Sequence, residues 1–232
     1  MQTVILAGGR GSRLAPITFD MPKPMIPIKD KPFLEYLLLM LKRNSLKKIL
    51  LCVGYLGNKI EAYFGDGRSL GIEIKYSYEK ELLGTGGALK LAGNLIEEKF
   101  FLLYGDSYLD INYSDFSQFF EAQKAIGAIV IYDNRMGHTK VKNNIALEGD
   151  LITKYNKIKE DTSLKYVEAG VSIFRKQLLN LIEANRFVSL ENDIFPILIR
   201  NKELTGYQSG TRFWDIGTFD KLNLFQSFEF NL

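Results

Sequence analysis

The sequence predicts an α/β protein in which helices cover both faces of a mostly parallel central sheet, a three-layer αβα sandwich. The first observation behind this prediction is the alternation of short apolar runs with segments of helical spacing over residues 3–132. Such βαβ alternation is typical of parallel strands joined by right-handed crossovers. The second is the composition: a chain of 232 residues that is 46% hydrophobic and 25% charged forms a globular protein with a sizeable core.

The first part of the chain alternates regularly between the two kinds of element. In chain order, we expect a strand at 3–6, a helix at 32–42, a strand at 48–53, a helix at 58–64 and a strand at 72–78. A helix at 87–95, a strand at 100–104, a helix at 113–125 and a strand at 128–132 follow. The strands are compact apolar runs, apart from 72–78, which alternates, whereas the helices carry apolar residues three or four positions apart. Gly65-Asp66-Gly67 ends the helix at 58–64.

After Asp133 the pattern loosens into shorter pieces separated by polar turns, which predicts a small added mixed or antiparallel portion. We expect strands at 145–148, 151–155 and 166–174, helices at 176–185 and 194–200, a strand at 204–208 and a last helix from residue 219. No linker rich in Pro, Gly and Ser divides the chain. We therefore expect a single domain over residues 1–232.

Composition and charge exclude several classes of function. Thirty Lys and Arg against 27 Asp and Glu give a net charge of +3, too small for the broad electrostatic footprint of a nucleic-acid-binding protein. The amino terminus has no basic leader, and the longest apolar stretches fall far below the ~20 residues that span a bilayer, so we expect a cytoplasmic protein without a membrane partner. A single cysteine, Cys52, and a single histidine, His138, exclude a disulfide framework and a conventional zinc site.

A glycine-rich loop follows the first expected strand and reads Leu6-Ala7-Gly8-Gly9-Arg10-Gly11-Ser12-Arg13-Leu14. Small residues let consecutive backbone N–H groups approach an anion, so the loop is either a phosphate cradle or a turn that binds nothing. The dinucleotide-binding pattern G-x-G-x-x-G does not match, because Leu14 occupies the position of its last glycine. The P-loop pattern fails because no Lys followed by Ser or Thr closes the segment.

Two cations accompany this loop. Arg13 lies within it, and Lys23 follows ten positions later between Pro22 and Pro24. The two prolines restrict the backbone on both sides of Lys23, so its ammonium is held on a stiff segment near the loop. A lysine that only faces solvent does not need a proline on each side, and we therefore expect Lys23 to be functional.

Together these motifs resemble the sugar-1-phosphate nucleotidyltransferases, the family also called NDP-sugar pyrophosphorylases. The resemblance runs from residue 2 to about 220. It continues through Tyr55-Leu56-Gly57, Glu79 to Ala88, Tyr104-Gly105-Asp106, Val167-Glu168-Ala169-Gly170 and Trp214-Asp215-Ile216-Gly217-Thr218. It implies a Rossmann-like fold, with residues 1–133 binding mainly the nucleotide and 134–232 mainly the sugar phosphate. The implied reaction joins a nucleoside triphosphate and a sugar 1-phosphate into an NDP-sugar and pyrophosphate, with Mg²⁺ as cofactor.

The resemblance also implies roles for single residues. Arg13 and Lys23 are the implied catalytic residues, Arg13 on the triphosphate and Lys23 between the α-phosphate and the sugar phosphate. The implied nucleotide-binding residues are Leu6, Ala7, Gly8, Gly9, Gly11, Ser12, Glu79, Gly84 and Thr85. Glu79 would accept hydrogen bonds from the base, which fits guanine, or else is a solvated carboxylate at a strand end.

The sugar phosphate and the metal have implied ligands of their own. The sugar-phosphate-binding residues would be Tyr104, Gly105, Asn143, Lys157, Glu168 and Gly170. Lys154 and Lys159 remain alternatives to Lys157, because its neighbours differ from the family's Glu-Lys-Pro. Asp106 and Asp215 would hold Mg²⁺, although either could instead be a helix cap or a turn residue.

The substrates are less sharply defined than the reaction. The strongest resemblance is to short guanylyltransferases acting on D-glycero-D-manno-heptose 1-phosphate or mannose 1-phosphate, which supply surface polysaccharide precursors. Uridylyl, cytidylyl or thymidylyl transfer and a non-catalytic nucleotide-sugar-binding module remain alternatives. Leu14 breaks the dinucleotide-binding pattern G-x-G-x-x-G, which disfavours an oxidoreductase. Asp106 is not part of an Asp-x-Asp motif, which disfavours a glycosyltransferase. The aromatics around Phe225 to Phe230 could form a homodimer contact or pack on the protein's own sheet.

Overall fold

The computed structural model describes residues 1–134, 139, 141–157 and 161–228, and it confirms the mixed α/β fold. In this part of the chain one nine-stranded sheet has the strand order β5-β4-β1-β6-β11-β8-β12-β10-β9. The bounds are β1 Gln2–Leu6, β4 Lys48–Val53, β5 Glu73–Tyr78, β6 Lys99–Tyr104, β8 Gly127–Asp133, β9 Ile145–Glu148, β10 Leu151–Tyr155, β11 Tyr166–Arg175 and β12 Leu204–Ser209. Neighbours from β5 to β6 pair in parallel, as do β8 and β12.

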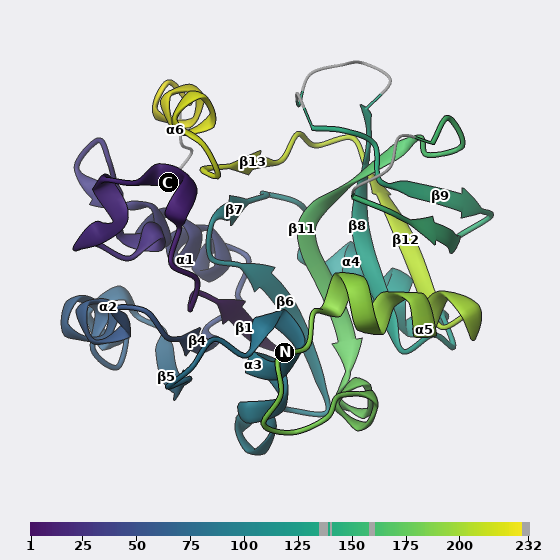
Figure 1. Cartoon of the computed structure of the whole chain (residues 1–232), viewed down its shortest axis with the longest axis horizontal. Helices are drawn as coiled ribbons and strands as arrows, with labels where there is room; N and C mark the ends of the chain where they lie inside the picture. Colours follow the sequence, from purple (N-terminus) through teal and green to yellow (C-terminus); the bar gives the residue numbers. More distant parts are fainter. Residues whose placement is uncertain (135–138, 140, 158–160, 229–232) are drawn as a thin grey trace.

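Helices cover both faces of this sheet, as the sequence predicts. They are α1 Phe33–Arg43, α2 Gly57–Phe64, α3 Gly84–Leu91, α4 Tyr113–Ala122, α5 Phe195–Arg200 and α6 Phe219–Gln226. Because side chains alternate along a strand, Ile5 faces the core under α1, α2, α4 and α6, whereas Val4 faces the core under α3 and α5. In Figure 1, α5 crosses one face of β8 and β12 while α4 lies behind them.

The place of residues 166–174 differs from the prediction. The sequence predicts this strand in the added portion, yet β11 lies inside the main sheet between β6 and β8 and runs antiparallel to both. Residues 167–174 are buried at every position, including the polar Glu168 and Ser172. These two polar side chains imitate the alternation of a half-exposed strand, which explains the error. The remaining added strands, β9 and β10, do lie at the sheet edge beyond β12.

The helix expected at 176–185 is also wrong. A 3₁₀ segment covers Lys176–Leu181, and Ile182 is extended. Leu178, Leu179 and Ile182 are buried, as the helical spacing predicts. The Leu179 carbonyl also accepts a hydrogen bond from Lys90 Nζ, at 2.8 Å. The other expected helices and strands are confirmed, some with unchanged bounds, such as 48–53, and others with shifted ends; the helix at 113–125, for example, ends at Ala122. None of the helices in the described ranges is long and apolar enough to cross a membrane.

The aromatic residues near the end of the chain pack within the protein. Phe225 in α6 is fully buried, with its ring centroid 5.0 Å from that of Phe33 and 6.3 Å from that of Trp214. Phe228 stacks beside it at 6.1 Å. The alternative of packing on the protein's own core is therefore the one observed for Phe225 and Phe228, and Phe230 lies outside the described residues.

Replacing Phe225 with alanine should lower the free energy of unfolding by about 3–5 kcal/mol, because a fully buried phenyl ring leaves a cavity. Phe219→Ala in the same helix should change it by less than about 0.5 kcal/mol, because Phe219 is 42% exposed. Urea denaturation followed by circular dichroism measures both. Equal effects of the two substitutions would contradict the role of Phe225 as the anchor of α6.

Candidate active site

Two cavities open where the central parallel strands end, the place at which open α/β sheets bind ligands. The glycine-loop cavity has a volume of about 390 Å³ and is lined by Leu6 at the end of β1, Cys52 in β4 and Tyr104 at the end of β6. The Glu168 cavity has a volume of about 290 Å³ and is lined by Glu168, Lys157 and Asp215 among others. Tyr104 and Asp106 line both cavities, so the two spaces meet at these residues.

Every residue expected to bind the nucleotide lines the glycine-loop cavity, and so do Arg13, Lys23 and Gly105. The loop is held by the strand ends: Ala7 N donates to Cys52 O at 2.8 Å and Gly105 N to Leu6 O at 2.8 Å. Gly11 has φ +65°, and a Cβ there would lie 2.9 Å from the Lys23 Cβ. The loop therefore needs glycine at this position to pass over the lysine segment.

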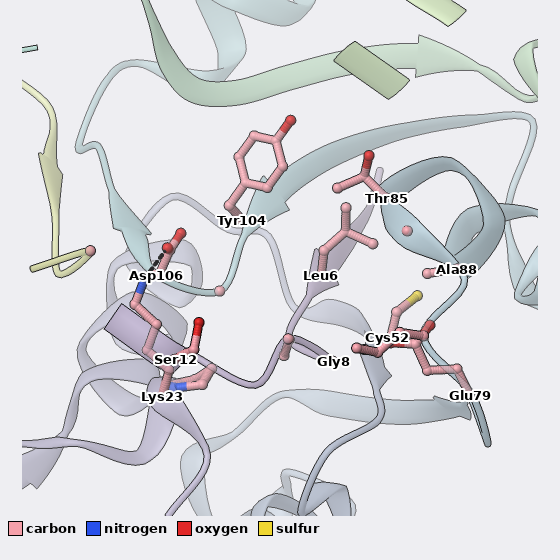
Figure 2. A pocket seen from close by; sticks show the side chains of 18 of the residues that line it. Leu6, Gly8, Ser12, Lys23, Cys52, Glu79, Thr85, Ala88, Tyr104 and Asp106 are labelled. Atoms are coloured by element: carbon pink, nitrogen blue, oxygen red, sulfur yellow. Dashed lines mark hydrogen bonds and ion pairs between the residues drawn. The ribbon is translucent and has the colours of Figure 1, made fainter. Parts of the chain in front are cut away.

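Glu79 lies against the loop at the end of the cavity away from Lys23, as Figure 2 shows. A Cβ on Gly8 would stand 2.1 Å from Glu79 Oε1, so the carboxylate occupies the space that this glycine leaves open. Its other oxygen accepts from Leu83 N at 3.1 Å. Burial raises the pKa of Glu79. The carboxylate is thus a half-buried wall of the cavity rather than a solvated strand end.

The two predicted cations lie on the side of the cavity nearest Asp106. Lys23 is only 8% exposed, and its Nζ donates to Asp106 Oδ2 (Figure 2). Arg13 lies beside Gly217, where a Cβ would be 3.4 Å from Arg13 Nη2. Burial raises the pKa of Asp106, but the charge and hydrogen bond of Lys23 outweigh this effect, so its pKa lies below its ordinary value.

The fold brings Asp106 and Asp215 together. Asp106 precedes β7, Ser107–Tyr108, which pairs antiparallel with β13, Trp214–Asp215, so that Ser107 stands opposite Asp215. Asp215 accepts from Gly217 N at 2.9 Å and from Lys221 Nζ at 2.7 Å.

Neither aspartate caps a helix. The side chain that caps α4 is Asn112, which accepts from Ser114 N and Asp115 N. The side chain that caps α6 is Thr218. The alternative of a helix cap is therefore wrong for both aspartates, whereas the bond from Gly217 N shows that Asp215 is a turn residue.

Charged groups and phenols surround the Glu168 cavity. Glu168 is 8% exposed, accepts from Tyr155 Oη and forms an ion pair with Lys157 Nζ at 2.9 Å. Burial lowers the pKa of Lys157, but the charges of Glu168 and Glu191 outweigh it and raise the pKa above its ordinary value. Gly170 has φ +80°, and a Cβ there would lie 2.8 Å from the Ser107 Cβ. Lys157, Glu168 and Gly170 line this cavity together, as expected of neighbours in one site.

The expected sugar contact Asn143 and the alternative Lys154 both lie away from the cavity lining. Asn143 donates to Leu164 O at 3.2 Å and is not among the residues that line the cavity. Its neighbour Asn144 lines the cavity instead, and its Oδ1 accepts from Glu168 N at 2.9 Å. Lys154 is bonded to Asp161 at 3.1 Å and lines neither cavity, whereas Lys159 and His138 lie outside the described residues.

Several lining residues had no signal in the sequence. They are Cys52, Phe187, Asn144, Glu191 and Lys221. They belong to none of the recognised motifs, and residue type alone does not choose between the adjacent Asn143 and Asn144. Burial raises the pKa of the Cys52 thiol to about 12, so Cys52 contributes an apolar wall rather than a reactive group.

Comparisons with known proteins place this chain in a family. The family model for nucleotidyl transferases matches residues 2–229. The D-glycero-alpha-D-manno-heptose 1-phosphate guanylyltransferase of Aneurinibacillus thermoaerophilus is 32% identical over 226 residues, covering 95% of this chain and 94% of that protein. The protein of the same name from Campylobacter jejuni is 49% identical over 114 residues, covering 49% of this chain and only 51% of its own length.

A solved structure extends the likeness to the fold. The crystal structure of HddC from Yersinia pseudotuberculosis complexed with GMP-PN superposes with a TM-score of 0.79 at 26% identity, covering 96% of each chain. The match of the family model over nearly the whole chain shows that this protein belongs to the nucleotidyl transferase family.

Proposed function

We propose that this protein is a sugar-1-phosphate guanylyltransferase, which joins GTP and a sugar 1-phosphate into a GDP-sugar and releases pyrophosphate. The observation that carries the proposal is the meeting of two cavities at Tyr104 and Asp106, with Lys23 bonded to Asp106 at the junction. A reaction between two phosphates needs both substrates held side by side next to fixed positive charge. The names of the relatives from Aneurinibacillus and Campylobacter support guanylyl transfer.

The reaction needs positioning and charge neutralisation rather than a protein nucleophile, because the attacking sugar phosphate is already an anion. Its oxygen attacks the α-phosphorus of GTP, and the bond from that phosphorus to the pyrophosphate breaks. Lys23 would hold the α-phosphate and the sugar phosphate together, and Arg13 would stabilise the charge on the leaving pyrophosphate. The N–H groups of Gly8, Gly9 and Gly11 would bind triphosphate oxygens.

Asp106 and Asp215 fit the cofactor that we propose, Mg²⁺. Nucleotidyltransferases generally use a divalent metal ion, and Mg²⁺ is usually held by one or two carboxylates together with substrate phosphates. Both aspartates line the Glu168 cavity, and across the described ranges no group of three or more His, Cys, Asp and Glu side chains could hold a metal. A bound ion would neutralise phosphate charge at the junction of the cavities.

Glu79 favours guanine as the base. Guanine presents two adjacent donors, N1–H and the 2-amino group, to one carboxylate, whereas uracil and thymine present a single N–H. A half-buried carboxylate gains most from a base that supplies both donors. Because nearly all residues that line the glycine-loop cavity lie before residue 134, residues 1–133 would bind mainly the nucleotide. Residues 134–232 would supply most sugar-phosphate contacts, with Tyr104 and Gly105 contributing from the first part.

Heptose 1-phosphate is the sugar substrate that we propose first, on the names of the two relatives, with mannose 1-phosphate second. Because GTP is a cytoplasmic metabolite, the protein would act in the cytoplasm. Its GDP-sugar would serve enzymes that build surface polysaccharides.

Pyrophosphate release from a panel of four triphosphates and several sugar 1-phosphates tests this proposal. GTP with D-glycero-D-manno-heptose 1-phosphate should give the highest kcat/KM, and the other triphosphates should fall at least about tenfold lower, the cost of about one hydrogen bond to a charged group. A preference for UTP, CTP or dTTP would contradict guanylyl transfer. If no pair of triphosphate and sugar 1-phosphate releases pyrophosphate, the proposed catalytic activity is contradicted, and a nucleotide-sugar-binding module is favoured.

A further inference from the structure

Glu191 is a buried carboxylate that no recognised motif includes. It lies in Leu190–Ile194, a π-helix in which Phe195 N bonds to Leu190 O. Such wide turns are rare and occur frequently at functional sites. The segment is held by Ser189, whose hydroxyl accepts from Asn192 N at 3.1 Å. The fold therefore keeps an uncommon backbone where Glu191 turns inward, with its side chain only 13% exposed.

The two oxygens of Glu191 have different surroundings. Oε2 accepts two hydroxyl groups, those of Thr85 at 2.8 Å and Ser189 at 2.8 Å. Oε1 accepts from Tyr104 Oη at 2.6 Å and lies 4.0 Å from Lys157 Nζ. Figure 2 shows the Tyr104 and Thr85 hydroxyls pointing the same way, away from Gly8. Glu191 is thus fixed through Oε2, whereas Oε1 lies on the side of Tyr104 and Lys157, both of which line the Glu168 cavity.

The cluster around the Glu168 cavity is rich in acceptors. Two carboxylates, Glu168 and Glu191, share the single ammonium of Lys157, at 2.9 Å and 4.0 Å. Burial raises the pKa of Glu191, but the hydrogen bond of Tyr104 and the charge of Lys157 outweigh it, so the pKa is lowered and the group is an anion at neutral pH. A carboxylate can accept about four hydrogen bonds, and from the described residues Oε1 accepts one hydroxyl.

We propose that Glu191 is a second sugar-binding carboxylate, whose Oε1 accepts a hydrogen bond from a ring hydroxyl of the sugar 1-phosphate. Glu168 and Glu191, which both contact Tyr104 and Lys157, then bind two different hydroxyls, and the site selects a sugar that presents both. This inference rests on the proposed function, because it assigns the Glu168 cavity to the sugar. It adds a contact that the motif residues do not supply.

Glu191→Gln tests the assignment, because the amide keeps the size of the side chain and removes its charge. KM for the sugar 1-phosphate should rise roughly 10- to 100-fold, the effect of losing one hydrogen bond to a charged group, while KM for the triphosphate changes less than about threefold. Asp193→Asn is the matched control. Asp193 is an exposed carboxylate of the same segment, bonded to Ser189 N at 2.7 Å, and it lines neither cavity. The control should leave both KM values unchanged.

Sugar 1-phosphates that lack one hydroxyl identify the contact itself. With the wild type, two different deoxy analogues should each raise KM at least about tenfold, one for each carboxylate. In Glu191→Gln, one of these two penalties should disappear and the other should remain. If the variant does not fold, the wild-type series still decides, because sensitivity to fewer than two hydroxyls would overturn the proposal.

The remaining outcomes separate this proposal from its premise. An active wild type together with a Glu191→Gln variant of unchanged sugar KM would overturn the sugar contact alone. Equal rises in both KM values, with a lower melting temperature, would show that Glu191 only supports the fold. A wild type inactive with every sugar 1-phosphate would instead contradict the proposed function.

Discussion

Lys23→Ala should lower kcat roughly 100-fold or more, with a smaller change in KM for either substrate. Lys23 is nearly buried at the junction of the two cavities, where its ammonium bonds Asp106. A contact made mainly in the transition state is worth ~3 kcal/mol, and its loss appears in turnover rather than in ground-state binding. Steady-state pyrophosphate release at saturating GTP and sugar 1-phosphate measures the effect.

Two further variants make this result specific. Lys47→Ala removes a solvent-exposed lysine just before β4. It lies at the amino-terminal end of that strand, whereas the cavities lie where the strands end, so the substitution should leave kcat unchanged. Lys23→Arg should recover little activity, because a planar fork does not replace a compact ammonium in a nearly closed space. Wild-type turnover in Lys23→Ala would remove this lysine from the mechanism.

Asp106→Asn and Asp215→Asn should each lower kcat by about 100-fold or more and raise the Mg²⁺ concentration that gives half-maximal activity. An amide oxygen is a weaker Mg²⁺ ligand than a carboxylate, and several kcal/mol of charge stabilisation depend on the ion. The fold supports a joint role, because the pairing of β7 with β13 places Ser107 opposite Asp215. Activity measured across a Mg²⁺ titration gives both quantities.

Asp115→Asn is the control for the two aspartates, because Asp115 is exposed in the first turn of α4 and lines neither cavity. It should leave the Mg²⁺ dependence unchanged. A wild-type Mg²⁺ response in both Asp106→Asn and Asp215→Asn would defeat the proposed metal site. A response altered in only one of them would reduce the site to a single protein ligand.

The fold could be predicted from the sequence wherever local pattern and final environment agree. β1, β4 and β6 are apolar runs because both faces of the sheet are covered, and the pattern records that directly. The prediction failed at β11, because buried Glu168 and Ser172 imitate surface residues, and at residues 176–185, because buried side chains at helical spacing do not require a helix. In both places tertiary contacts overrode the local signal.

The sequence by itself determined the chemistry that this protein carries: a glycine loop with two fixed cations, two distant aspartates and a Glu-x-Gly segment. These are properties of residue type and short spacing, and the backbone enforces them locally through glycine and proline. Only the tertiary structure decided which groups meet. The β7–β13 pairing brought Asp106 and Asp215 to one cavity, the segment before β9 placed Asn144 rather than Asn143 there, and a π-helix turned Glu191 toward Tyr104. Such contacts join segments far apart in the chain, so no local pattern records them.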